Sequence, residues 1–246
     1  MILVIGGIKG GSGKTTLATN LTVARSKKNK RVLLVDADEQ GSASDWVEQR
    51  EALGIATPWT TIKLFGPSTR SQIQKMASDY DDIIVDTGGR DTTSQRAALT
   101  IADKFLVPFQ PRSLDIWTLG NVLELINEIH SVNEKLQSFA VINRADPMGN
   151  DNVDTADILG ESELISYINT PIGQRKAFAN ASAEGLGVLE LKRTDKKAES
   201  EILNLFNEIF SSKKTKKRTF THFTTHKHTT NVLNKQEKEN LLTWSE

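Results

Sequence analysis

Cysteine is absent from this chain of 246 residues, and its absence removes a whole group of chemistries. Without thiols there are no disulfide bonds, no thiolate metal sites, no iron–sulfur clusters and no cysteine nucleophiles. Long apolar runs are absent too, because none approaches the roughly 20 residues that span a membrane. The first strand-like run starts at residue 2, so we expect neither a signal peptide nor a transmembrane helix, and a cytoplasmic protein.

A net charge is also lacking, since 31 lysines and arginines balance 31 aspartates and glutamates. No global electrostatic field therefore points to nucleic acid as a partner. The balance is uneven along the chain, because residues 211–246 contain eight basic residues and only three glutamates. We expect one globular domain over residues 1–211, long enough to bury a full core, and a basic, disordered tail over residues 212–246.

Short apolar runs alternate with helical patterns along the first 211 residues. This alternation is typical of an α/β fold, a doubly wound, mostly parallel sheet with helices on both faces. In such sheets ligands bind outside the carboxyl ends of the strands, where the polar residues that follow each run should converge. We expect strands at residues 2–8, 31–36, 82–86, 104–108 and 139–143, and helices at about 15–28, 42–53, 68–78, 92–101, 115–131, 152–166 and 197–211.

A glycine-rich stretch, Lys9-Gly10-Gly11-Ser12-Gly13-Lys14-Thr15-Thr16, follows the first run. It ends in Gly-Lys-Thr, as does the P-loop template G-x-x-x-x-G-K-[ST]. In a P-loop, backbone N–H groups surround phosphate oxygens, the lysine neutralises the β- and γ-phosphates, and the hydroxyl ligates Mg²⁺. The alternative is a flexible glycine turn between a strand and a helix. The order of strand, loop, Lys-Thr and helix favours a nucleoside triphosphate site.

Carboxylates follow the second and third apolar runs. Asp86 has the form of the second nucleotide-binding motif, and Mg²⁺ prefers such oxygen ligands while keeping several waters. Asp36 and Asp38 are two residues apart, so on a continuing strand they share a face and could flank one Mg²⁺ or one attacking water. The alternative is that one of them only caps the helix that starts near Ser42.

Lys9 narrows the class, because a lysine five positions before the phosphate lysine resembles the deviant Walker A motif of the ParA/MinD/nitrogenase iron-protein class. The likeness covers about residues 1–210, and within the class it is greatest to the small ParA ATPases of plasmid partition, which have no N-terminal DNA-reading domain. Arg112 and the tail depart from that pattern, and the iron–sulfur branch is excluded by the lack of cysteine. The matching segments are Asp36-x-Asp38-x-Gln40, Asp86-Thr87-Gly88-Gly89, Val107-Pro108-Phe109-Gln110-Pro111, Ile172-Gly173-Gln174-Arg175 and residues 183–188.

The resemblance implies a role for each motif residue. Lys9 would reach across a dimer interface to the phosphates of the partner's ATP, and Lys14 would hold phosphates in its own subunit. Asp38 would orient the attacking water, which makes Lys9, Lys14 and Asp38 the candidate catalytic residues. The implied ligands of Mg²⁺ are Thr15, Asp36 and Asp86, those of the ATP phosphates are Gly10, Gly11, Ser12, Gly13, Lys14, Thr15 and Thr16, and those of the adenine are Asn143 and Arg144.

Features late in the chain have two interpretations each. An apolar stripe over residues 202–210 predicts either a last core helix, which we favour, or, with the basic run 213–218, an amphipathic helix on an anionic membrane. The histidines His222, His226 and His228 are interpreted either as a metal site or as part of a disordered tail, and we favour the tail. Six basic residues are either ordinary solvated side chains or a nonspecific DNA patch: Arg175, Lys176, Lys192, Arg193, Lys196 and Lys197.

The resulting prediction is a Mg²⁺-dependent ATPase that dimerises on ATP and binds nonspecific DNA on the nucleoid. With a ParB-like partner that stimulates slow hydrolysis to ADP and phosphate, it would segregate a plasmid or another mobile element. One alternative is a MinD-like ATPase that positions a protein cargo or acts on a membrane. Another is an ATP-dependent biosynthetic enzyme of the same fold, although no residues specify a small-molecule pocket beside the γ-phosphate.

Overall fold

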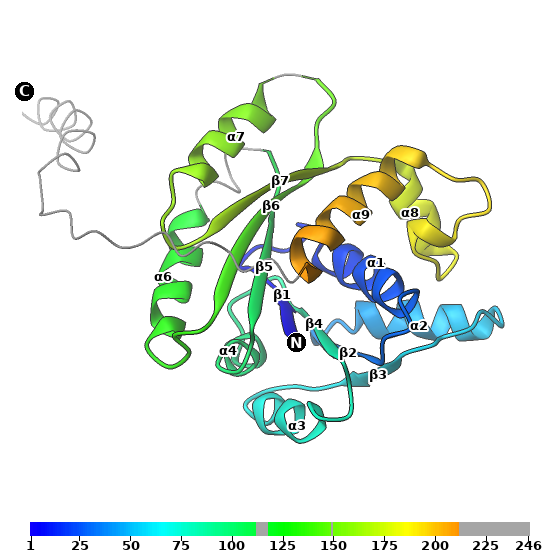
Figure 1. Ribbon diagram of the computed structural model, residues 1–246, viewed down its shortest axis with the longest axis horizontal. Helices are drawn as coiled ribbons and strands as arrows, with labels where there is room; N and C mark the ends of the chain where they lie inside the picture. Colours follow the sequence, from blue (N-terminus) through cyan, green and yellow to red (C-terminus); the bar gives the residue numbers. More distant parts are fainter. Residues whose placement is uncertain (112–117, 149, 212–246) are drawn as a thin grey trace, which may run out of the picture. The chain divides into compact units, whose positions relative to one another are not determined.

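The computed structural model describes residues 1–111, 118–148 and 150–211, and Met1–Ser211 form one compact unit (Figure 1). Its centre is a seven-stranded sheet in the order β3-β2-β4-β1-β5-β6-β7, and neighbouring strands pair in parallel. The strands are β1 (Ile2–Ile5), β2 (Val32–Ala37), β3 (Thr60–Lys63), β4 (Asp82–Thr87), β5 (Lys104–Phe109), β6 (Gln137–Ala145) and β7 (Ser166–Gly173).

The central strands are apolar throughout because both faces of the sheet are covered. Every residue of β2 and β4 is buried, including the aspartates at their carboxyl ends. The edge strand β3 reads Thr-Thr-Ile-Lys and is only partly buried. Burial on one face or on neither allows polar residues, so the edge strands carry a weaker apolar signal than the centre.

Helices pack on both faces of the sheet (Figure 1). One face carries α1 (Lys14–Ser26), α2 (Ser42–Ala52), α8 (Lys176–Ala183) and α9 (Lys196–Phe210), whose buried residues form a single core cluster with a short 3₁₀ turn, η1 (Val188–Glu190). The opposite face carries α3 (Ser68–Met76), α4 (Thr93–Leu99), α6 (Leu119–His130) and α7 (Asp151–Gly160) over a second cluster.

The predicted α/β fold is confirmed, with the whole described sheet parallel. All five predicted strands are present, although β1 ends at Ile5 and not at residue 8. The edge strands β3 and β7 and helix α8 were not predicted, and the helix expected over 152–166 ends at Gly160 because the chain then enters β7. The start of the helix expected over 115–131, at residues 115–117, lies outside the described residues.

The apolar stripe near the end of the unit packs into the core. Ile202, Leu205 and Ile209 on α9 are fully buried and belong to the same cluster as α1. The core interpretation of this stripe is therefore confirmed over the membrane interpretation. The basic run 213–218 and the three tail histidines lie outside the described residues.

Strand register brings the functional segments to one edge of the sheet. Ile5 is opposite Asp86 on one side of β4, and Asp36 is opposite Asp86 on the other. The chain leaves β1 for β2 on one side of the sheet and returns to β5 on the other, so β1 marks the point where strand order reverses. Ligands of open α/β sheets bind at such a point, beside the carboxyl ends of the strands.

Candidate functional site

The loop between β1 and α1 leaves its helix N-terminus open. Gly13 precedes α1 in a left-handed conformation with φ 91°, which glycine adopts without strain, and no side chain caps the helix. The first turn of α1 contains no acidic residue. The unpaired N–H groups and the positive end of the helix dipole therefore form an anion site that a phosphate would satisfy.

Two glycines allow close approaches around this loop. A Cβ on Gly89 would lie 2.5 Å from the Cα of Gly10, so only glycine lets the segment after β4 reach the loop. A Cβ on Gly13 would lie 2.1 Å from Nδ2 of Asn143. Open space surrounds the Cα atoms of Gly10 and Gly11, so the outer part of the loop forms a cradle with room for a ligand.

Lys14 is buried at the base of the loop and its Nζ donates to the carbonyl of Lys9 at 2.9 Å. Burial lowers the pKa of Lys14, while the nearby carboxylates of Asp86 and Asp38 raise it. The ammonium group is thus held inside the loop on a neutral acceptor. A phosphate oxygen would be a stronger, charge-assisted acceptor for it.

Asp86 is fully buried at the end of β4. Among the described residues neither of its carboxylate oxygens has a hydrogen-bond partner of normal geometry. Burial raises the pKa of Asp86 to about 7, against the opposing influence of the Thr15 hydroxyl and Lys14, and with further raising by Asp36 and Asp38. A buried, unpartnered carboxylate is costly, and a Mg²⁺ ion with its waters would supply the missing partner.

The described residues contain no cluster of three or more histidines, cysteines or carboxylates arranged as a complete metal cage. This fits Mg²⁺, which is usually held by one or two carboxylates together with phosphates and water. The Thr15 hydroxyl and Asp86 are the groups that fit that pattern here. With a nucleotide bound, these two groups would hold the Mg²⁺ ion, and the charge of the ion would offset that of the phosphates.

Asp36 is also fully buried, but its carboxylate is occupied by protein donors. Oδ2 accepts from the backbone N–H and the hydroxyl of Ser44 at 2.8 and 2.7 Å, and Oδ1 accepts from the N–H of Asp38 at 3.2 Å. Ser44 lies in the first turn of α2, so Asp36 performs the capping role left open by the sequence. These contacts make Asp36 a weaker candidate than Asp86 for direct ligation of Mg²⁺.

Asp38 lies half-buried just beyond β2. Its Oδ1 accepts from the N–H of Gln40 at 3.1 Å, and a Cβ on Gly88 would lie 3.2 Å from the same oxygen. Asp38 is thus beside the segment that follows β4, and its charge acts on Lys14. Of the three aspartates it is the one with exposed carboxylate surface beside the loop, which suits a group that positions water.

Asn143 contacts the loop itself. Its Nδ2 donates to the carbonyl of Ser12 at 2.6 Å, from a buried position near the end of β6. Arg144 follows with φ 56°, where the pairing of β6 with β7 is irregular, and its side chain is exposed. Both residues are brought to the carboxyl edge of the sheet, and their predicted contact with adenine stays a prediction.

Two glutamines support the loop in ways that the sequence did not reveal. Gln110 Nε2 donates to the carbonyl of Gly11 at 2.8 Å. Gln95 Oε1 accepts from the N–H of Gly7 at 2.9 Å and from the Thr87 hydroxyl at 2.8 Å. Gln110 stood in one of the matching motifs, whereas Gln95 lies in α4 with no motif around it.

Lys9 is half-buried on the outer part of the loop. Its predicted action on the nucleotide of a second subunit concerns a partner chain, so it remains a prediction. Ile8 stands where the P-loop template has its first glycine, so the match rests on the glycines at 10, 11 and 13 and on the final Gly-Lys-Thr. The loop geometry holds without a glycine at that position.

Comparison with known proteins gives the same assignment. Residues 3–188 match the family model described as the CobQ/CobB/MinD/ParA nucleotide binding domain. The chain is 29% identical over 217 residues to Maintenance of carboxysome distribution protein A of Halothiobacillus neapolitanus, which covers 85% of this chain and 96% of that protein. It is 31% identical over 215 residues to the protein of the same name from Gloeobacter kilaueensis, covering 85% and 93%.

Among solved structures, an ATP complex of McdA from Cyanothece superposes with a TM-score of 0.68. The sequences are 17% identical, and the match covers 84% of this chain and 95% of that one, so the likeness is one of fold. With the glycine loop, the buried aspartate and the family match in agreement, the chain belongs to the CobQ/CobB/MinD/ParA nucleotide-binding family, as a ParA/MinD-type ATPase whose cofactors are ATP and Mg²⁺.

Proposed function

We propose that this ATPase positions a cargo by cycling between an ATP-bound homodimer on nonspecific DNA and a released form. Members of the family dimerise and act with partner proteins. The observation that carries the proposal is the shared edge of the sheet. The helix-terminus anion site, Lys14 and Asp38 meet there, together with Asp86, whose carboxylate has no hydrogen-bond partner of normal geometry among the described residues, and Lys9 lies at the same edge. Chemistry at this edge would couple hydrolysis to release of the partner subunit.

The cycle rests on Lys9 acting in trans. A lysine that contacts the γ-phosphate in the other subunit makes that phosphate part of the dimer interface. Hydrolysis then removes an interface contact, so the dimer lasts only as long as the triphosphate. A partner protein that stimulates hydrolysis would set the lifetime of the dimer.

Exposed basic residues on the second half of the unit supply a surface for DNA. Lys192 and Arg193 lie in the loop before α9, and Lys196 and Lys197 lie in its first turn. Cations are unfavourable near a helix N-terminus, so four of them there are not explained by helix stability. Arg175 differs, because Glu201 accepts from its Nε at 3.0 and 3.1 Å, which leaves it a structural role.

The cargo of the proposed cycle has two candidates. The first is a protein assembly, supported by the two relatives that are named for carboxysome distribution and match nearly their whole length. The second is a plasmid or other mobile element with a ParB-like partner, supported by the motif resemblance. In either case, binding to nonspecific chromosomal DNA would place the protein on the nucleoid. A biosynthetic reaction has no supporting observation in the site.

Membrane binding is the competing proposal for the surface. Within the described ranges, no helix is both long and apolar enough to cross a bilayer. The apolar side of α9, the helix that could have lain on a membrane, is buried against α1 and the sheet. The burial of this apolar side favours DNA as the surface on which the dimer rests.

The test is a titration of unrelated DNA duplexes and of anionic vesicles with the full chain, in ATP and in ADP. We expect DNA binding only with ATP, independent of sequence, and falling steeply with salt. Lys192→Glu with Arg193→Glu removes four cations from a dimer and should flatten the logarithmic salt slope by about 3 to 4. Lys27→Glu with Lys28→Glu, an exposed pair at the end of α1, is the matched control. Vesicle binding without DNA binding would overturn the proposal.

The cargo is tested separately, by deleting the gene in its own host. A protein cargo predicts that assemblies cluster in the cell while every replicon is retained at the parental rate. Plasmid loss with normally spaced assemblies would replace this cargo with the second candidate.

A further inference from the structure

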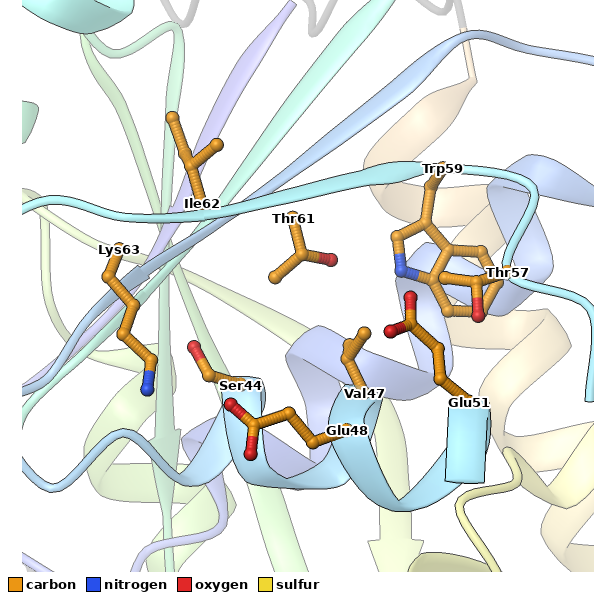
Figure 2. Close-up of a pocket in the computed structure, with 9 residues that line it drawn as sticks. All are labelled: Ser44, Val47, Glu48, Glu51, Thr57, Trp59, Thr61, Ile62 and Lys63. Carbon is orange, nitrogen blue, oxygen red and sulfur yellow. The ribbon is translucent and has the colours of Figure 1, made fainter. Parts of the chain in front are cut away.

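A second pocket lies between α2 and the edge strand β3, with a cavity of about 240 Å³ (Figure 2). None of the nucleotide-loop residues lines it. That volume lies below the roughly 300–1,000 Å³ of pockets that take drug-sized ligands, and would suit one long side chain. The residues that line it are Ser44, Val47, Glu48 and Glu51 from α2, and Thr57, Trp59, Thr61, Ile62 and Lys63 from the β3 segment.

Two polar atoms in this pocket lack the partners that buried polar atoms normally have. Trp59 is only 8% exposed, and neither its Nε1 nor the hydroxyl of Thr61 has a hydrogen-bond partner among the described residues. Figure 2 shows both groups turned into the space between the strand and α2. An unmade hydrogen bond at a buried donor costs about 1–3 kcal/mol, and both atoms are buried at the wall of the pocket, where they are not exposed to solvent.

The Trp59 ring is held in this orientation by its other neighbours. It stacks on Trp46, with ring centroids 5.7 Å apart and an interplanar angle of 9°. The Arg50 guanidinium lies 4.8 Å from the Trp59 centroid. Arg50 is itself fixed by Glu190 and by the carbonyls of Ala56 and Gly185. The ring cannot turn its N–H elsewhere without breaking this stack.

The charges around the pocket favour a cation. Glu48 and Glu51 rise from one side of α2, three residues apart, and Lys63 faces them from β3 (Figure 2). None of these three side chains forms an ion pair with another described residue. The pocket therefore carries one excess negative charge. A fitting ligand carries a cationic group for the two glutamates, beside the Trp59 indole.

The open strand edge supplies the backbone for such a ligand. β3 is the last strand of the sheet, and its side away from β2 pairs with no described strand. Unpaired N–H and C=O groups of an edge strand are a template for an added strand, whose side chains alternate between the two faces. A side chain on the α2 face of that added strand would enter this pocket.

We propose that β3 and α2 bind an extended peptide segment of a partner protein, with a lysine or arginine side chain between Glu48 and Glu51. This site is separate from the DNA surface and the nucleotide loop. It touches the nucleotide site through one residue, since Ser44 lines the pocket and also holds Asp36. An occupant of the pocket would therefore contact α2. This helix is held through Ser44 by Asp36, which lies two residues before Asp38.

The test uses the full chain and a blocked pentapeptide, acetyl-Val-Thr-Arg-Thr-Val-amide, with the same peptide carrying neutral citrulline in place of arginine. The readout is the ¹⁵N–¹H signal of the Trp59 indole, assigned with Trp59→Phe. We expect a saturable downfield shift with the arginine peptide and at least fivefold weaker binding of the citrulline peptide. Glu48→Gln and Glu51→Gln should each weaken binding about two- to fivefold, because exposed ion pairs are screened.

The matched control is Glu208→Gln, an exposed glutamate on α9 that should leave the binding unchanged. Equal binding of the citrulline peptide, or no indole shift at millimolar peptide, would overturn the proposal. Free arginine that binds as tightly as the peptide would also overturn it, because the site would then take a small molecule and not an added strand. An effect of Glu208→Gln equal to that of Glu51→Gln would show that the pocket glutamates have no specific role.

Discussion

At the scale of single residues, three aspartates at one edge of the sheet differ in their partners. Asp36 is saturated by Ser44 and the backbone, Asp86 is buried without a partner of normal geometry, and Asp38 keeps exposed surface. The residue type and its place after a strand are the same in each case. The donors that the surrounding segments bring to each carboxylate separate the helix cap Asp36 from the proposed metal ligand Asp86 and the proposed water-positioning residue Asp38.

Asp38→Ala tests the role of the exposed carboxylate. A group that positions water acts in the transition state, so ATP affinity should stay within about threefold while turnover falls about a hundredfold or more. Nucleotide binding and single-turnover hydrolysis measure the two effects. Hydrolysis at the parental rate would assign the water to another residue.

Asp86 predicts a pH dependence of the nucleotide-free protein. Its pKa is about 7 in the folded state against 3.8 for the ordinary carboxyl, so the folded protein holds this proton more tightly than the unfolded chain does. This contribution to the free energy of unfolding is fully present below about pH 4 and is lost as the pH rises through about 7. Asp86→Asn should flatten the fall in stability between these pH values, measured by urea unfolding. An unchanged slope would mean that Asp86 is ionised throughout.

At the scale of elements, α2 connects three features of the molecule. Its first turn is capped by Asp36, its middle packs Trp46 against Trp59, and its exposed side forms one wall of the second pocket. The cap comes from β2 and not from the residue before the helix, which is Gly41 in a left-handed conformation. A motif search of the helix alone would not find it.

Ser44→Ala measures what this cap contributes. The mutation removes a buried hydroxyl that donates to a carboxylate, and a hydrogen bond to a charged group contributes about 1.5–3 kcal/mol. Because the N–H of residue 44 still reaches Asp36, we expect a loss near the lower figure, about 1.5 kcal/mol. Ser42→Ala, at the exposed start of the same helix, is the control and should change stability by less than about 0.5 kcal/mol. Equal losses of stability in the two variants would show that the Asp36–Ser44 contact does not stabilise the protein as a helix cap.

At the scale of the whole molecule, parallel topology collects the site. β1 lies between β4 and β5, so the loop after β1, the aspartates after β2 and β4, and Asn143 on β6 reach a single edge. No two of these segments are close in sequence. An edge of this kind can be closed by a second copy of the chain, which is where the Lys9 prediction applies.

Lys9→Ala should weaken the ATP-dependent dimer. If each subunit loses one charge-assisted contact of about 1.5–3 kcal/mol, the dissociation constant of the dimer rises about a hundredfold or more. Sedimentation with a nonhydrolysable ATP analogue and with ADP measures the mass of each state. Lys28→Ala, an exposed lysine two residues beyond the end of α1, is the control. The same monomer mass of the parental protein in both nucleotides would contradict the dimer model.

The sequence by itself determined the α/β class with a mostly parallel sheet, the five central strands and the glycine-rich loop between β1 and α1. These features depend on local physics: strands buried on both faces must be apolar, and a loop that surrounds phosphate must contain glycine. The edge strands escaped prediction because a half-exposed strand tolerates threonine and lysine, as in β3. Only the tertiary structure decided that Asp36 is a cap, that Gln95 and Asn143 hold the loop, and that Trp59 lines a second pocket. Such roles depend on atoms from distant segments meeting within hydrogen-bond distance, and no local pattern encodes that meeting.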